Sequence, residues 1–207
     1  ELFPIDKWIE AENKVMKENG AAALQYGPTD GYKRLREHCI TRMNKVGVKN
    51  VEADDIQVLS GSQQGLDFMA RIFIDPGDYI VVESPTYLGA LNAFKAYEPK
   101  FLQVPLDEDG MVLEDLENAL KNNDNVKFIY VISDFQNPSG KTWTMERRKG
   151  LIELANKYDV MILEDNPYGE LRFEGEIQPS LRSLDTEDRV IFMGTFSKIF
   201  SPGIRVG

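Results

Sequence analysis

The sequence contains one cysteine and one histidine in 207 residues. A single cysteine, Cys39, cannot form an internal disulfide, and a chain without disulfides suits a reducing compartment, so we expect a cytoplasmic protein. Sites for zinc and other soft metals need several cysteines or histidines, so we expect no metal site of that kind. His38 and Cys39 lie in a helix-like stretch, and we assign no chemical role to either residue.

Basic residues are fewer than acidic ones: the chain has 24 Lys and Arg and 34 Asp and Glu, which gives a formal net charge of −10. This excess of acid argues against a nucleic acid or an anionic membrane surface as the main partner. A bound anion would need a local cluster of donors. No apolar run approaches the roughly 20 residues of a membrane span and no basic, apolar leader is present, so we expect neither a membrane span nor a signal peptide.

Short apolar runs alternate with helix-like stretches along the chain. The runs lie at 56–59, 79–82, 100–104, 127–132, 160–164 and 189–194. Their near-continuous apolar character, rich in Val and Ile, is typical of parallel strands that are buried on both faces. Helix-like patterns mark the segments 5–19, 31–46, 62–73, 110–122 and 144–158. The alternation predicts an α/β fold, with a doubly wound and mainly parallel sheet flanked by helices.

The residues that follow the predicted strands form the candidate site, because ligands of such sheets bind beyond the carboxyl ends of the strands. Ser60–Gly65 follows the first run, and its small residues would let an anion approach the free N–H groups of a helix start. A serine that simply caps the helix is the alternative, and for this motif alone it is favoured. Tyr87 follows the second run, and its ring either covers a flat ligand or packs a helix on the sheet.

Two nucleotide-binding motifs are absent. Gly140-Lys141-Thr142 resembles the end of a P-loop, but Phe135 stands where that motif needs a glycine. No G-x-G-x-x-G pattern follows the first predicted strand, which disfavours a dinucleotide-binding domain. Taken alone, Asn137 and the three residues after it have the composition of an ordinary turn.

Asp165 stands at the end of a strand that should be buried on both faces. An isolated buried charge is costly, so this carboxylate needs a partner. A protonated ring nitrogen of a ligand and the guanidinium of Arg172 would both serve. The last apolar run is followed by a cluster of polar and basic residues, Thr195, Ser197, Lys198 and Arg205.

Together these residues call for a ligand with a phosphate, a flat ring, a ring nitrogen and a group that a lysine can attack. Pyridoxal 5'-phosphate has all four. Lys198 would form a Schiff base with its aldehyde, and Asp165 would keep its ring nitrogen protonated so that the ring acts as an electron sink. Arg205 would supply a full positive charge for the phosphate.

The chain resembles the fold-type I, class I and II aminotransferases over essentially all of its length. Five motifs carry the resemblance and occur in the family's order: "SGSQQG" at 60–65, "PTY" at 85–87, "NPSG" at 137–140, "EDNPYGELRFEG" at 164–175, and "TFSK" at 195–198 with "PGIRVG" at 202–207. The fourth motif looks most like the branch that contains the 2-aminoadipate and aromatic aminotransferases.

The resemblance implies a role for each matching residue. Lys198 would be the Schiff-base lysine and proton shuttle, Asp165 would pair with the pyridine nitrogen, and Tyr87 would stack on the ring. Asn137 and Tyr168 would hydrogen-bond the phenolic oxygen of the ring. The phosphate would be held by Gly61, Ser62, Gln63, Ser197 and Arg205, with Thr195 as a weaker candidate.

The resemblance also implies a division of the chain. Residues 1–30 would form an N-terminal helix and a dimer-contact segment, and Tyr26 would reach the phosphate site of a partner subunit in a homodimer. Residues 31–207 would form the cofactor-binding large domain, whose seven-stranded sheet includes an antiparallel strand that begins near Arg205. The family's C-terminal small domain, which supplies an arginine for the substrate carboxylate, would lie outside these 207 residues.

The expected reaction is a two-stage transfer of an amino group from an amino acid to a 2-oxo acid, with glutamate and 2-oxoglutarate as one pair. Another pyridoxal phosphate reaction on the same fold, a β-lyase or a decarboxylase, would use the same motifs. A regulatory domain that senses pyridoxal phosphate beside a DNA-binding domain is a third reading, which the acidic composition disfavours.

Overall fold

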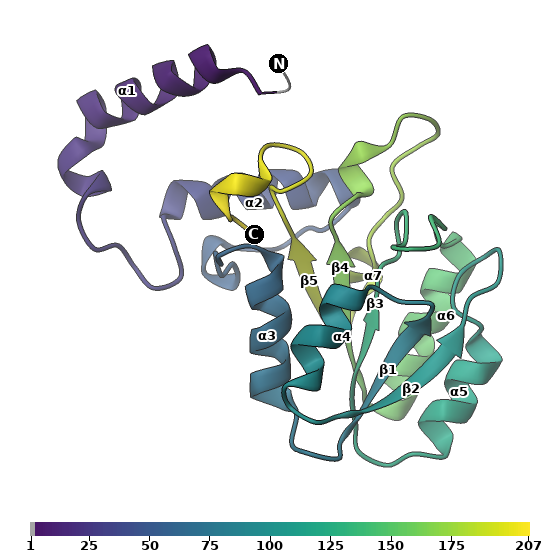
Figure 1. The fold of residues 1–207 in the computed structure, drawn as a ribbon. Coiled ribbons are helices and arrows are strands. Elements are labelled where there is room, and N and C mark those ends of the chain that lie inside the picture. The colour runs from purple at the N-terminus through teal and green to yellow at the C-terminus, as the bar shows by residue number, and fades with distance from the viewer. Residues whose placement is uncertain (1–2) are drawn as a thin grey trace.

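A computed structural model describes residues 3–207 of the chain. Within these residues, five strands form one parallel sheet in the order β2-β1-β3-β4-β5 (Figure 1). The strands are β1 (Tyr79–Ser84), β2 (Lys100–Pro105), β3 (Val126–Val131), β4 (Met161–Asn166) and β5 (Val190–Gly194). All five carboxyl ends therefore meet at one edge of the sheet.

Helices cover both faces of the sheet (Figure 1). On one face lie α3 (Ser62–Phe73) and α4 (Leu88–Lys95), and on the other lie α5 (Leu113–Lys121), α6 (Met145–Tyr158) and α7 (Leu181–Leu184). Successive strand residues point to opposite faces, so Ile80 and Val82 pack with the first pair of helices and Val81 packs with the second group. The predicted fold, a mainly parallel sheet flanked by helices, is confirmed.

Two further helices, α1 (Ile5–Ala23) and α2 (Lys33–Met43), precede the sheet. α1 extends away from the sheet and has no buried residue (Figure 1). It contacts the body through Trp8, whose ring stacks on that of Phe200 at 4.9 Å between centroids. Short 3₁₀ helices occupy Asn44–Val46, Ala53–Asp55, Gly169–Leu171 and Pro202–Ile204. Among residues 3–207, no helix combines the length and apolar character needed to cross a bilayer.

The prediction of a strand at 56–59 is wrong for residues 3–207. This run is extended but lies outside the sheet, because no strand runs beside it. Instead, Val58 donates its N–H to the Asp30 carbonyl, and Leu59 exchanges backbone hydrogen bonds of 2.8 and 3.2 Å with Gly207. The antiparallel strand that the resemblance implies would begin near Arg205 and be cut off at Gly207, and residues 3–207 do not test it. Arg205 itself follows a 3₁₀ turn and has a φ of 53°.

Candidate functional site

A cavity of about 230 Å³ lies at the carboxyl edge of the sheet. The loops that follow β1, β3, β4 and β5 and the start of α3 supply its walls, which are lined by Ser62, Gln63, Tyr87, Ile132, Asn137, Asp165, Pro167, Tyr168, Thr195, Ser197, Lys198, Pro202 and Arg205. The structure thus brings together all the site residues that the sequence suggested, except Gly61 and Tyr26. The sequence analysis missed Ile132, Pro167 and Pro202 as lining residues, although Pro167 and Pro202 lie within two of its motifs and Ile132 ends the predicted run 127–132.

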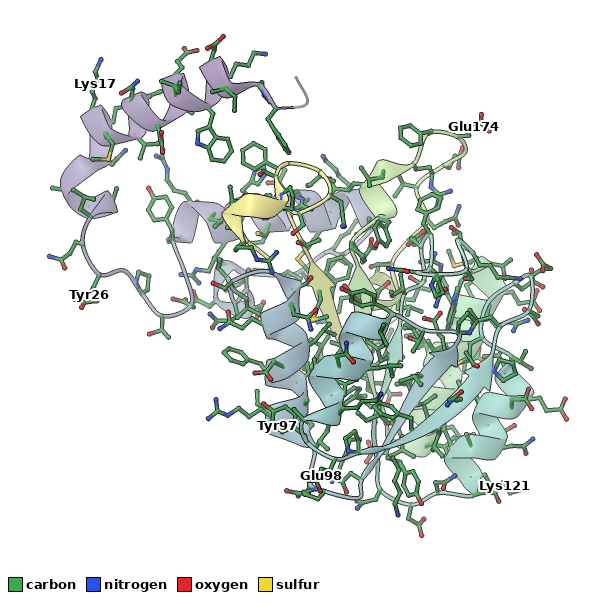
Figure 2. The ribbon with its side chains drawn as sticks, viewed as in Figure 1. Lys17, Tyr26, Tyr97, Glu98, Lys121 and Glu174 are labelled. Atoms are coloured by element: carbon green, nitrogen blue, oxygen red, sulfur yellow. The ribbon has the colours of Figure 1, made fainter. Side chains whose placement is uncertain are left out.

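The two exceptions differ. Gly61 lies at the rim, where its φ is 78° and a Cβ added to it would come within 2.8 Å of Arg205 Nη2. The backbone of Gly61 therefore lies against the guanidinium of a cavity residue. Tyr26 is 99% exposed, and Figure 2 places it on the loop after α1, remote from the sheet. Its predicted contact is with a second subunit, so a single chain does not test it.

Asp165 is the buried charge of the cavity. It lies in β4 with 3% of its surface exposed. Its Oδ2 accepts a hydrogen bond of 2.9 Å from the hydroxyl of Tyr130, and its buried Oδ1 has no hydrogen-bond partner among residues 3–207. Burial raises the pKa of Asp165 to about 6, against the smaller opposing effect of the Tyr130 hydroxyl. Such an oxygen is costly to leave without a donor, so the site is chemically incomplete by itself.

The alternative partner for Asp165, Arg172, is bound elsewhere. Arg172 Nη2 lies 3.1 Å from Asp134 Oδ1, and its guanidinium lies over the ring of Phe135 at 4.7 Å from the centroid. Asp134 also pairs with the fully buried Arg148 at 3.1 Å. The interpretation of Asp165 as a structural partner of Arg172 is therefore wrong, and within residues 3–207 no basic side chain forms an ion pair with Asp165.

The start of α3 and Arg205 form a positively polarised corner of the cavity. The N-cap of α3 is Gly61, and no side chain caps it, so the simple serine cap that the motif allowed is not formed. The first N–H groups of a helix attract anions, and Arg205 adds a full charge beside them. Thr195 and Ser197 complete this corner, but the Thr195 hydroxyl is used internally, bonding to Ser197 Oγ at 3.0 Å.

Four side chains occupy the remaining wall, those of Asn137, Tyr168, Lys198 and Tyr87. Asn137 Nδ2 donates to the hydroxyl of Tyr168 at 3.5 Å, so two polar groups from different loops lie at one point. Lys198 is exposed, and its Nζ lies 6.0 Å from the centroid of the Tyr168 ring. Tyr87 packs against the core beside α4, as the packing interpretation predicts, and it also lines the cavity.

Comparison with known proteins agrees with this constellation. The sequence profile of the family described as "Aminotransferase class I and II" matches residues 1–207. The chain is 49% identical to Aromatic-amino-acid aminotransferase 1 of Thermococcus litoralis and 39% identical to 2-aminoadipate transaminase of Thermus thermophilus, in each case over 100% of this chain and 51% of the relative.

Solved structures show the same likeness. A crystal structure of Pyrococcus horikoshii kynurenine aminotransferase in complex with PMP matches with a TM-score of 0.93 and 46% identity over 99% of this chain and 52% of that one. LysN, the alpha-aminoadipate aminotransferase of Thermus thermophilus complexed with N-(5'-phosphopyridoxyl)-L-leucine, matches with a TM-score of 0.91 and 38% identity, covering 99% of this chain and 52% of LysN. The chain thus spans about half the length of the relatives that it matches.

Proposed function

Because the chain belongs to the class I and II aminotransferase family, we propose that it forms the cofactor-binding part of a pyridoxal 5'-phosphate-dependent aminotransferase. Residues 31–207 would be the large domain and residues 1–30 an N-terminal helix and dimer-contact segment. The observation that carries the proposal is Asp165, whose buried Oδ1 has no donor among residues 3–207 in a cavity that Lys198 and Arg205 also line.

The donors and acceptors of the cavity fit this cofactor. Asp165 Oδ1 needs a donor, and a protonated pyridine nitrogen is one. The start of α3 with Arg205, Ser62, Gln63 and Ser197 offers N–H, O–H and guanidinium groups to a phosphate. When bound, pyridoxal phosphate supplies a ring that stabilises negative charge on the α-carbon of an amino acid.

Each polar side chain then has a defined task. Lys198 would hold the cofactor through its Nζ and, once released by a substrate amino acid, would act as the base that moves the proton of the substrate α-carbon. Asp165 Oδ1 would accept the N–H of a protonated ring nitrogen, whose positive charge would oppose the effect of burial on the pKa of Asp165. Asn137 and Tyr168 would hold the ring oxygen through hydrogen bonds, and Tyr87 would cover one face of the ring.

The relatives suggest the substrate class. They include aminotransferases named for aromatic amino acids, 2-aminoadipate and kynurenine, so we propose an amino acid of this kind as donor and a 2-oxo acid as acceptor, with glutamate and 2-oxoglutarate as one pair. We further propose a homodimer in which Tyr26 reaches the partner's phosphate site, in keeping with its exposure. The cytoplasmic location that we propose rests on the single cysteine.

Covalent trapping tests the proposal. The purified protein is mixed with pyridoxal phosphate, its visible absorbance is recorded, and borohydride is added before the modified peptide is mapped. We expect the absorbance to disappear and the label to lie on Lys198, with no label on Lys141, a lysine of a neighbouring loop that pairs with Glu108. A label on another lysine would overturn the assignment. Analysis of the products from glutamate separates amino transfer from decarboxylation, and an amino acid with a leaving group on its β-carbon tests β-elimination.

A further inference from the structure

Glu83, near the end of β1, is a buried carboxyl that lies outside the cavity lining. Only 1% of its surface is exposed. Its Oε2 accepts hydrogen bonds from Ile132 N–H at 3.1 Å and Gln136 Nε2 at 3.2 Å, and its Oε1 accepts one from Trp143 Nε1 at 3.2 Å. Among residues 3–207, no cation forms an ion pair with it. Burial of an acid among neutral donors costs stability, so its presence calls for a reason.

The three donors belong to a single segment, 132–143, which connects β3 to α6 and carries Asn137 to the cavity wall. Ile132 lies at its start, Gln136 directly before Asn137, and Trp143 at its end. Glu83 therefore binds this segment at both ends and in the middle. It does so across 49 to 60 positions of sequence, so no local turn preference can replace these contacts.

Gln136 extends the contacts to a second loop. Its Nε2 also donates to the carbonyl oxygen of Pro85 at 2.8 Å, two residues before Tyr87. Its Oε1 accepts from both the N–H and the hydroxyl of Ser139, at 2.8 and 2.6 Å. Gln136 is buried, with 1% of its surface exposed. Its side chain thus joins the loop that carries Tyr87 to the loop that carries Asn137.

We propose that Glu83 and Gln136 act as a pair of positioning residues that hold Asn137 and Tyr87 on opposite loops of the cofactor cavity. The inference rests on the proposed function for the identity of the ligand, but not for the contacts themselves. A carboxyl suits position 83 because both its oxygens accept hydrogen bonds. Burial raises the pKa of Glu83 to about 8, and the oxygen that then carries the proton at neutral pH can still accept through its remaining lone pairs, which an amide nitrogen cannot do. A glutamine there would turn its amide nitrogen toward at least one of the three N–H donors and leave that donor without an acceptor.

Two isosteric acid-to-amide variants distinguish an effect on the position of the loops from an effect on global stability. Glu83→Gln changes one member of the Glu83–Gln136 pair. Asp78→Asn is the control, because Asp78 is also buried at 4%, lies directly before the amino end of the same strand, and accepts from Asp75 N–H and Asn125 Nδ2 far from the cavity. Asp78 differs from Glu83 in that it also pairs with Lys127 at 3.4 Å, so its loss should affect global stability and not the segment 132–143. Gln136→Met, which keeps Glu83 and the side-chain volume, serves as a second test if Glu83→Gln does not fold.

The first measurement is amide hydrogen exchange of residues 137–141 in the cofactor-free protein. We expect Glu83→Gln and Gln136→Met to speed this exchange about tenfold, the scale of one buried hydrogen bond, while Asp78→Asn leaves it unchanged at matched global stability. The second measurement is the pH midpoint of the visible absorbance of added pyridoxal phosphate, which should shift in the two site variants and not in the control.

The outcomes are distinguishable. Equal exchange rates in Glu83→Gln, Gln136→Met and Asp78→Asn overturn the positioning proposal, whatever the cofactor does. Faster exchange in the two site variants, with no absorbance change on adding pyridoxal phosphate to the unaltered protein, supports the positioning role and refutes the proposed function. Faster exchange with an unmoved absorbance midpoint overturns the claim that the pair positions groups for the cofactor.

Discussion

Two groups of buried charge lie near the carboxyl edge of the sheet, and they are built differently. In the first, Asp134 pairs with Arg148 and Arg172, and Arg148 also donates to Ser133 and to backbone carbonyls of Trp143 and Pro179. In the second, Asp165 receives one neutral hydrogen bond and keeps an unpartnered oxygen among residues 3–207.

The two groups differ in whether the chain itself supplies a partner of opposite charge. In the first group each charge meets an opposite charge within the chain, although the Nε of Arg172 has no hydrogen-bond partner among residues 3–207, and these pairs contribute to the stability of one fold. In the second group the carboxylate meets no opposite charge among these residues, and we propose that a ligand supplies its partner. Substitutions in the two groups should therefore affect different measurements, and we make predictions for four substitutions, from the largest expected effect to the smallest.

Lys198→Ala should give the largest effect. It removes the only side chain proposed to bond the cofactor and carry the proton, so turnover should fall by about 10³-fold or more while Arg205 and Asp165 still bind some cofactor without a covalent bond. Steady-state transamination and equilibrium dialysis with pyridoxal phosphate measure the two quantities. Turnover within tenfold of the unaltered protein would show that Lys198 is not the reacting lysine.

Arg148→Met should break the paired group. The substitution keeps the volume but leaves Asp134 with Arg172 as its one remaining cation among residues 3–207, so we expect the free energy of unfolding to fall by about 3–5 kcal/mol. Urea denaturation of the cofactor-free protein measures this loss. A loss below about 1 kcal/mol would mean that the network contributes little to stability.

Asp165→Asn should stabilise the cofactor-free protein in a pH-dependent way. Because burial raises the pKa of Asp165 from 3.8 to about 6 in the folded state, its proton is held more tightly there, and the corresponding stability is lost as the pH rises through 6. Asparagine does not titrate, so the variant does not lose stability in this way. The difference in unfolding free energy between the variant and the parent protein should grow in favour of the variant from pH 4 to pH 7, up to about 3 kcal/mol.

The same substitution should act in the opposite direction on the enzyme reaction. Asparagine cannot keep a ring nitrogen protonated, so amino transfer should fall by orders of magnitude although the fold is more stable. Urea denaturation at several pH values and rapid-mixing kinetics give the two results. A variant that is less stable than the parent at pH 7 would show that Asp165 has a structural partner after all.

Tyr130→Phe should have the smallest effect. It removes the hydroxyl that donates to Asp165 Oδ2, and this hydrogen bond opposes the rise in the pKa of Asp165. The pKa of Asp165 should therefore rise further, and turnover at neutral pH should fall about tenfold or less, the scale of one hydrogen bond. A pH–rate profile that keeps its acid limb in place would separate Tyr130 from the tuning of Asp165.

Local patterns predicted the sheet well because a strand buried on both faces must be apolar along its length. All five strands lie within two residues of predicted runs. The run at 56–59 has the same composition but is not a strand among residues 3–207, because pairing depends on a neighbour that composition does not reveal. No specific helix was predicted at Leu88–Lys95, which is short and offers little periodicity.

Part of the candidate site could be predicted from the sequence and part could not. The side chains that line the cavity follow strands and belong to family motifs, so their position at one edge of the sheet was predicted. The residues that hold these side chains in place were not predicted, because their contacts join positions that are distant in the sequence. Glu83 and Gln136 are 53 residues apart in the sequence, and Arg172 forms its ion pair with Asp134 instead of Asp165. The sequence shows which acidic and basic residues are present, but it does not show which of them pair in the folded chain.

The stacking of Trp8 on Phe200 provides an optical reporter. The chain has two tryptophans. Trp8 contacts the loop that carries Lys198, two residues from that lysine, and Trp143 is buried with its indole N–H on Glu83. Replacing either tryptophan by phenylalanine leaves a single emitter. Emission from Trp8 then follows the attachment of the N-terminal helix, and emission from Trp143 follows the surroundings of the 132–143 segment.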